Sequence, residues 1–295
     1  IKNRFIKLPI IPYLKLLTVN IGGRKTTAYD EINRGQIALI NALNDPRYRF
    51  ICAALARRLG KTFIVNVIGQ LVTLVPGSNV LIMSPNYNLS GISFDLQRTF
   101  IRQFDLEIER DNLKDKVIRL SNGSEIRMGS VGTVDSSVGR SYDLIIFDEA
   151  ALSSAGEEAF ERSLRPTLDR PGAKAVFIST PRGKNNWFAK FYNRGFDDSY
   201  PEWCSIRADY TENARMSEKD VAEARRSMSK ANFEQEYMAN FNVYEGQIFT
   251  VEDKDIIDEF FWHEGCESLA GLDPGWRDPT AFITIVYSQR DDCFY

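Results

Sequence analysis

Apolar and polar positions divide most of the chain before about residue 205 into buried strands and amphipathic helices. Four nearly continuous apolar runs are typical of strands covered on both faces, at residues 50–54, 79–85, 142–147 and 174–180. Helical spacing of apolar residues is found at residues 30–43, 62–71, 89–104 and 157–168. Strands that alternate with helices predict an α/β fold with a mostly parallel central sheet and helices on both faces.

Two stretches inside this region follow other patterns. Residues 117–120 and 125–128 flank a polar turn, so they predict a β-hairpin. Residues 1–28 hold short apolar runs, two prolines and a basic glycine turn. We interpret this first segment as an arm or lid rather than a core element.

The character of the chain changes after about Trp203. Residues 216–241 are polar and predict helices, with Ser217 as a plausible cap. Two alternating stretches follow, at residues 268–272 and 281–287, and predict a new pair of strands. The chain therefore contains a second, smaller folding region after the α/β part.

Composition restricts the class of protein only broadly. The 295 residues carry a net charge of −3 and 43% hydrophobic residues, which is ordinary for a globular protein of about two domains. The single histidine, His263, excludes a two-histidine metal site within this chain, and the four cysteines form no CxxC pair. No run of about eighteen apolar residues is present, so we expect no membrane partner. The first and last residues, Ile1 and Tyr295, suggest a fragment of a longer protein.

A phosphate-binding loop is the clearest chemical feature. Residues 55–62 end in Gly60, Lys61 and Thr62, between a predicted strand and a predicted helix. In such a loop the lysine reaches the phosphates of a nucleotide, and the threonine hydroxyl holds Mg²⁺. Leu55 replaces the usual first glycine. The alternative is a surface turn with a solvated lysine, which the strand and helix on either side disfavour.

Two adjacent carboxylates follow another buried strand. Residues 144–147 are apolar, and Asp148 and Glu149 come directly after them. We expect Asp148 to hold Mg²⁺ and Glu149 to polarise the attacking water. Two neighbouring carboxylates are costly unless a cation and a substrate require them, although a solvated acidic turn is the simpler alternative.

Several further side chains are candidates around a bound ATP. The hydroxyls of Ser179 and Thr180 end the next strand and are placed to sense the γ-phosphate, unless they only precede a proline turn. Gln36 precedes Lys61 by 25 residues, and its amide matches an adenine edge, while Tyr29 is placed to stack on the base. A surface role for the glutamine remains the alternative.

Arginines near the loop are candidates to neutralise the charge that develops in phosphoryl transfer. Arg57 and Arg58 lie inside the loop and would act within the same subunit. Arg140 lies on a glycine-flanked loop before the acidic strand and would reach a neighbouring subunit. The sequence leaves the choice among them open.

A last motif surrounds Asp273, which ends one predicted strand before a Gly-containing turn and a second strand. Ribonuclease H-like nucleases present their first metal-binding aspartate in this way, and two-metal hydrolysis requires several carboxylates. A β-hairpin with a polar turn is the alternative.

Together these motifs resemble the large terminase subunit of tailed bacteriophages, the DNA-packaging motor. The resemblance rests on Gln36, the variant loop at residues 55–62, the acidic pair of residues 148–149, the Ser-Thr-Pro-Arg-Gly stretch at residues 179–183 and the strand ending at Asp273. Replacement of the first loop glycine, with arginine inside the loop, is itself typical of that family.

The resemblance implies an ASCE-type P-loop ATPase that binds ATP and Mg²⁺. The loop contacts to the nucleotide would come from Leu59, Gly60, Lys61, Thr62 and Phe63. It implies an arm at residues 1–29, an ATPase core at 30–205, a small lid subdomain at 206–262 and the start of a nuclease domain at 263–295. The later nuclease acids, which would bind Mg²⁺ or Mn²⁺, should lie beyond Tyr295, so we expect no DNA cleavage by this chain alone.

The implied function is translocation of double-stranded viral DNA into procapsids, driven by ATP hydrolysis. The implied partners are that DNA, the small terminase subunit, the portal protein and further copies in a ring, a pentamer by resemblance. The implied location is the cytoplasm of the infected bacterium, without retention in the mature virion. A superfamily 2 helicase and a non-catalytic DNA-binding module are the alternatives. The helicase requires a second RecA-like domain, for which about 90 residues after the fourth strand are too few.

Overall fold

The computed structural model describes residues 8–241, 263–275, 280–290 and 292–294. The chain divides into two compact units, Ile1–Gly246 and Gln247–Tyr295.

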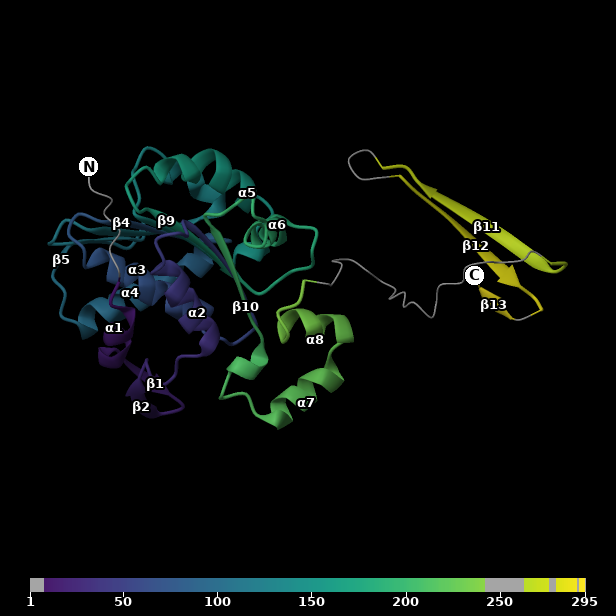
Figure 1. Ribbon diagram of the computed structural model, residues 1–295, viewed down its shortest axis with the longest axis horizontal. Helices are drawn as coiled ribbons and strands as arrows, with labels where there is room; N and C mark the ends of the chain where they lie inside the picture. The colour runs from purple at the N-terminus through teal and green to yellow at the C-terminus, as the bar shows by residue number, and fades with distance from the viewer. Residues whose placement is uncertain (1–7, 242–262, 276–279, 291, 295) are drawn as a thin grey trace. The chain divides into compact units, whose positions relative to one another are not determined.

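A central sheet organises the first unit (Figure 1). Among the described residues its strands lie in the order β10 (Trp203–Ala208), β3 (Phe50–Leu55), β9 (Lys174–Ser179), β8 (Leu144–Asp148), β4 (Asn79–Ser84), β7 (Glu125–Ser130), β6 (Val117–Leu120) and β5 (Ile108–Asn112). The pairs from β10 to β7 are parallel, whereas β6 and β5 join antiparallel at one edge. The predicted mostly parallel sheet is confirmed.

Helices cover both faces of the sheet (Figure 1). One face carries α1 (Ile10–Leu16), α2 (Arg34–Leu43), α3 (Lys61–Thr73) and α4 (Tyr87–Gln103); the other carries α5 (Gly156–Glu158) and α6 (Trp187–Arg194). Short turns complete the unit: η1 (Val131–Ser137), η2 (Ala150–Leu152), η3 (Ala159–Leu164), η4 (Arg165–Thr167) and η5 (Tyr210–Glu212). Strand β3 is buried on both sides, since Ile51 belongs to one core and Phe50 to the other. This explains its continuous apolar run.

The second core is dominated by aromatic rings. Phe177 stacks on Trp203 with ring centroids 5.8 Å apart, and it meets Phe160 edge-on at 4.8 Å. Offset and edge-on pairs of this kind add stabilisation beyond the area they bury. The rings fix β9 against β10 and α6, and β9 ends at the predicted coupling hydroxyls.

Several predicted elements need correction. The strand β10 was not predicted, although it pairs with β3 from Trp203 opposite Phe50 to Ala208 opposite Leu55. It lies at the sheet edge, so its polar positions face outward and weaken the apolar signal. The edge strand β5 escaped prediction for the same reason. The predicted helix at 157–168 is a short α-helix followed by π- and 3-10-helical turns, the last of which contains Pro166.

The N-terminal segment is also different from the prediction. Helix α1 buries Leu14, and Leu17 behind it is fully buried in the same core as α3. The expectation that residues 1–28 contribute no core element is therefore wrong. After α1, strands β1 (Thr18–Ile21) and β2 (Arg24–Thr27) form a hairpin whose tip is the basic glycine turn.

Residues 209–241, here called the 209–241 segment, follow β10 with helices α7 (Glu218–Ser227) and α8 (Lys230–Glu236). The predicted cap is confirmed, since the Ser217 side chain accepts from the Asp220 amide in a capping box. Tyr210 N–H donates to the Tyr237 carbonyl at 2.8 Å and joins the two ends of the segment.

The second unit contains an antiparallel sheet of β11 (Cys266–Asp273), β12 (Ala281–Ser288) and β13 (Cys293–Phe294). The two strands predicted here are confirmed and are longer than expected. Within the described part of the chain, no helix has the length and apolar character needed to cross a membrane.

Candidate nucleotide-binding site

The phosphate loop connects β3 to α3. Helix α3 begins at Lys61, so its first N–H groups point into the loop, where an anion would be stabilised. Gly60 has φ of 67°, and a Cβ atom there would lie 2.7 Å from Nε2 of Gln36. Arg58, although not a glycine, has φ of 64°. The loop therefore turns sharply in a conformation that only a glycine at position 60 accommodates without strain.

Lys61 is the centre of the site. Its side chain is only 6% exposed, and Nζ donates to Thr180 Oγ1 at 2.7 Å and to the Ala56 carbonyl at 3.3 Å. Nζ also lies 3.6 Å from Glu149 Oε1. The lysine, the second carboxylate of the acidic pair and the Ser-Thr motif therefore converge at the carboxyl ends of three strands.

Asp148 ends β8 and is 6% exposed. Burial raises the pKa of its carboxyl group to about 6, although a hydrogen bond from Thr62 and the charge of Lys61 oppose this rise. A buried carboxylate beside a threonine hydroxyl is an oxygen donor set that suits a hard cation such as Mg²⁺. Asp148 and Thr62 therefore fit the metal that the sequence predicts.

Glu149 has an unusual backbone, with φ of 50°. Its Oε2 accepts from Ser179 Oγ at 3.4 Å, and its side chain remains 31% exposed. Non-glycine residues in the left-handed region are costly and are found where neighbouring contacts hold them. In this turn the Glu149 N–H donates to Asp148 Oδ1 at 3.1 Å, and the Glu149 carboxylate lies beside Lys61.

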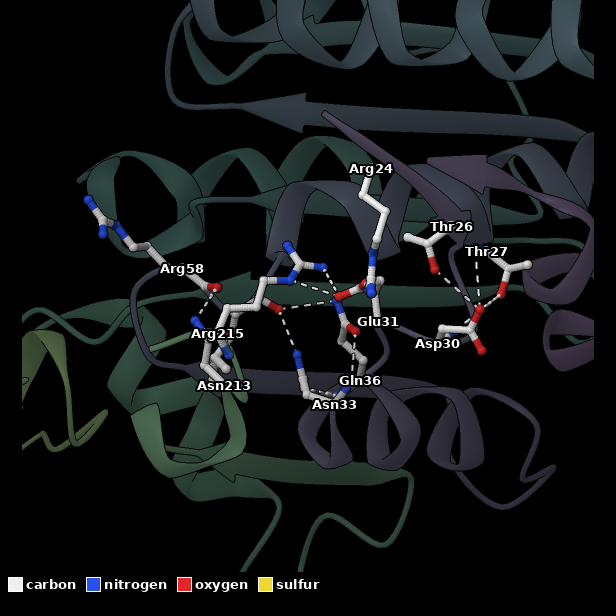
Figure 2. Close-up of polar contacts among 11 residues, drawn as sticks. Arg24, Thr26, Thr27, Asp30, Glu31, Asn33, Gln36, Arg58, Asn213 and Arg215 are labelled. Carbon is white, nitrogen blue, oxygen red and sulfur yellow. Dashed lines mark hydrogen bonds and ion pairs between the residues drawn. The ribbon is translucent and has the colours of Figure 1, made fainter. Parts of the chain in front are cut away.

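Gln36 braces the phosphate loop from helix α2 (Figure 2). It is 5% exposed, and its Nε2 donates to the carbonyls of Leu59 and Gly60, each at 3.1 Å. Its Oε1 accepts from the N–H of Asn33, whose side chain caps the helix and donates to Leu59. Gln36 is thus buried against the loop rather than at the surface, while contact with an adenine base stays a prediction.

A cavity of about 480 Å³ lies beside the loop. Its walls come from the β1–β2 hairpin, the start of α2, the phosphate loop, α4 and the 209–241 segment; they include Asn20, Glu31, Asn33, Gln36, Arg58, Leu59, Gly60, Phe63, Phe100, Gln103, Asn213 and Arg215. Tyr29 is not among the lining residues; Lys15 Nζ lies over its ring at 4.8 Å. The size and the mixed polar and apolar lining suit a nucleoside.

The three candidate arginines lie in different surroundings. Arg57 is 65% exposed and lies 3.8 Å from Glu236 of α8, while the exposed Arg58 lines the cavity. Arg140 is 43% exposed and donates to Glu125 at 3.3 Å. Arg57 and Arg58 are thus near the phosphate loop, and Arg140 is held at another part of the unit.

Asp273 belongs to the second unit, at the end of β11, and is exposed. Across the described residues, no group of three or more acidic, histidine or cysteine side chains is arranged to hold a metal ion. The nuclease role of Asp273 stays a prediction.

The sequence did not reveal the contacts of the 209–241 segment with the site. Asn213 donates to the Arg58 carbonyl at 3.1 Å, and Arg215 pairs with Glu31 (Figure 2). No spacing signal links residues so far apart. Asn33, in contrast, was detectable, because Asn-x-x-Gln is a capping-box pattern.

The fold and the arrangement of the site define a P-loop NTPase of the ASCE class. A sequence model of the family described as "Terminase large subunit, T4likevirus-type, N-terminal" matches residues 52–256, more than half of the chain. The chain belongs to this terminase large subunit family. The chain is therefore a member of the terminase family that its motifs resemble, and the helicase alternative is not supported.

Curated relatives agree with this assignment. The chain is 47% identical over 303 residues to the terminase large subunit of Escherichia phage T5, covering 100% of this chain and 66% of that protein. It is 27% identical over 233 residues to the large subunit of Thermus phage G20c, covering 67% of this chain and 47% of that protein. The chain thus spans less than two thirds of the length of these relatives.

Solved structures share the fold. The ATPase domain of the Thermus phage P74-26 large terminase matches with a TM-score of 0.60 at 24% identity, covering 70% of this chain and 93% of that one. The HK97 bacteriophage large terminase matches with a TM-score of 0.64 at 16% identity, covering 99% of this chain and 66% of that one.

Proposed function

We propose that this chain binds and hydrolyses ATP at the phosphate loop. The observation that carries the proposal is the meeting of Lys61 with Thr180 and Glu149 beside the buried Asp148. Lys61 binds the β- and γ-phosphates, Thr62 and Asp148 hold Mg²⁺, and Glu149 accepts a proton from the attacking water. The metal supplies positive charge that the phosphates require in phosphoryl transfer.

The cavity is the proposed site of the base and ribose. Leu59, Gly60 and Phe63 line it next to the phosphate loop, together with Gln36. The hydrogen bonds of Gln36 to the loop support a role in holding the loop and the base in one arrangement. Tyr29 is the weaker candidate, because its ring lies under Lys15 and outside the lining.

We further propose that Ser179 and Thr180 report the state of the γ-phosphate. Ser179 contacts Glu149, and Thr180 contacts Lys61, so both hydroxyls touch the groups closest to the reacting phosphate. The same loop continues to Gly183, whose N–H donates to Gln235 of α8 at 3.1 Å. A change in the positions of Ser179 and Thr180 on release of the γ-phosphate would thereby be transmitted to the 209–241 segment.

The family supports a DNA-packaging motor as the function of the whole protein. We propose that it moves double-stranded viral DNA through mainly phosphate contacts, which are tolerant of sequence and sensitive to salt. Its partners would be the small terminase subunit, the portal protein and further copies in a ring, in the cytoplasm of the infected bacterium. Asp273 would contribute to a Mg²⁺- or Mn²⁺-dependent nuclease only together with further acids.

The domain boundaries belong to the same proposal. An ATPase core at residues 30–205 would carry the chemistry, and a lid at residues 206–262 would include the end of β10 and the 209–241 segment. Residues 242–262 of that lid lie outside the described residues. The arm at residues 1–29 contributes α1 to the core and the β1–β2 hairpin to the cavity.

Two variants test the proposed chemistry. Lys61→Ala should abolish ATP hydrolysis, because the phosphates lose their buried cation. Glu149→Gln should still bind ATP but hydrolyse it at least about 10²-fold more slowly, because only the proton acceptor is lost. Binding of a fluorescent ATP analogue and phosphate release are measured for both variants. Turnover retained by Lys61→Ala, or binding lost by Glu149→Gln, would contradict the assigned roles.

A further inference from the structure

An ion pair joins two segments that are distant in the sequence and that both line the cavity (Figure 2). Arg215, in the turn before α7, donates from Nε to Oε2 of Glu31 at 2.8 Å, and a second guanidinium nitrogen lies 2.6 Å from the same oxygen. Glu31 lies just before helix α2, 184 residues away in the sequence. Two contacts from one planar guanidinium fix its orientation better than a single contact would.

Glu31 is the shared member of a small charge cluster. Its side chain is only 16% exposed, and its other oxygen, Oε1, lies 3.4 Å from Arg24 of the hairpin. Arg24 is 77% exposed, whereas Arg215 is 50% exposed. The shorter and less exposed pair is therefore the one with Arg215, and it connects two segments that both line the cavity.

The turn that carries Arg215 also holds the phosphate loop. Asn213 Nδ2 donates to the carbonyl of Arg58 at 3.1 Å. Arg58 has a left-handed backbone, which a non-glycine residue adopts at a cost and keeps when neighbours hold it. The turn at residues 213–215 is thus bound on one side to the phosphate loop and on the other to the segment before α2.

We propose that Arg215 and Glu31 form a clasp that retains nucleotide in the cavity. The inference rests on the proposed function, because it takes the cavity as the site of the base and ribose. For nucleotide to leave, the turn at residues 213–215 has to separate from Glu31. Arg215 and Glu31 are positioning residues, since they act on the walls of the cavity and not on the reacting phosphates.

The expected effect is on the rate of nucleotide dissociation. An ion pair at a half-exposed site stabilises the closed arrangement modestly, so we expect breaking it to raise the dissociation rate constant by about three- to tenfold. The KM for ATP should rise by more than kcat changes. Removal of a residue that only supported the fold would lower the melting temperature without raising the KM for ATP more than it changes kcat.

The test is a stopped-flow chase of mant-ADP and Mg²⁺ from the whole chain. Arg215→Ala and the isosteric Glu31→Gln should each accelerate release, and the double variant should release no faster than the single variants, because both remove the same pair. Arg215→Lys should restore part of the retention. Arg24→Ala is the matched control, since it removes the exposed partner of the same carboxylate, and should change release less than about twofold.

The outcomes separate the clasp from the proposed function. If the wild-type chain binds mant-ADP, and Arg215→Ala and Glu31→Gln release it at the wild-type rate, the clasp is overturned while the nucleotide site stands. Additive effects in the double variant, or equal acceleration by Arg24→Ala, would also overturn it. If the wild-type chain binds no mant-ADP, the proposed function fails and the clasp fails with it.

Discussion

The carboxyl group of Asp148 lies buried at the end of β8, and its pKa is raised to about 6 by burial. In the unfolded chain the carboxyl group titrates near its ordinary value of 3.8. The folded state therefore binds more protons than the unfolded state between about pH 4 and pH 6. Stability contributed by this group is present below pH 4 and is lost as the pH rises through 6.

Asp148→Asn should remove this dependence. In buffer with EDTA, we expect the free energy of unfolding of the wild type, relative to the variant, to fall by about 2 kcal/mol between pH 4 and pH 7. Urea titrations at several pH values measure the difference. A difference between the two proteins that stays constant over this interval would contradict the raised pKa.

Single residues were predictable where the chemistry restricts the residue type. Lys61, Thr62 and Asp148 could be assigned as candidates because few side chains suit a phosphate or a metal. The left-handed backbone of Glu149 had no sequence signal, since glutamate rarely adopts it. The partner of Arg215 was equally hidden, because long-range ion pairs leave no spacing pattern.

At the scale of elements, helix α2 holds the phosphate loop in place through the side chain of Gln36. Gly60 has φ of 67°, and the Gln36 amide lies where a side chain would begin. An alanine would meet both a strained backbone and a steric conflict. Gly77, with φ of 73°, has the same backbone requirement but no atom within 4 Å of the Cβ position.

These two glycines give a matched pair of variants. We expect Gly77→Ala to lower stability by about 1 kcal/mol, because alanine is strained at positive φ, and Gly60→Ala to lower it by more, because it also displaces Gln36. Only Gly60→Ala should also weaken binding of mant-ATP, since its side chain displaces Gln36 from the loop. Thermal melts and fluorescence titrations measure both effects. Equal nucleotide affinity in the two variants would show that the Gln36 contact is dispensable.

Whether an element could be predicted from the sequence depends on how much of it is buried in the folded unit. Strands β3, β4, β8 and β9 lie inside the sheet and are apolar on both faces, so their runs were visible in the sequence. The edge strands β5 and β10 have polar, exposed positions and were missed. The N-terminal helix was underestimated because it is short and follows Pro9, although it buries Leu14.

At the scale of the whole molecule, Arg140 is held by its own subunit. It shares Glu125 with Arg119 and Arg127, and all three arginines lie within 3.3 Å of that carboxylate. To act on a neighbouring nucleotide it must exchange Glu125 for the partner's phosphates. The choice among Arg57, Arg58 and Arg140 therefore requires an experiment on assembled subunits.

A mixture of inactive variants tests whether Arg140 acts on a neighbouring subunit. With full-length protein and procapsids, Arg140→Ala alone should lose about 10³-fold in ATP hydrolysis if it is the finger. Mixing it with Lys61→Ala should restore part of the activity, because the latter supplies an intact Arg140 to its neighbour. The control mixture, with a Lys61→Ala/Arg140→Ala double variant, should restore none. Equal activity in both mixtures would exclude action between subunits.

The pairing of β10 with β3 has a mechanical consequence. Strand β3 leads into the phosphate loop and β10 into the 209–241 segment, and the two run parallel over six residue pairs. A pull on that segment along the strand axis loads these backbone hydrogen bonds in shear, all at once. Bonds that share a load resist more force than bonds that open one after another. We therefore expect tension on the 209–241 segment to be transmitted through β10 to the strand that leads into the phosphate loop.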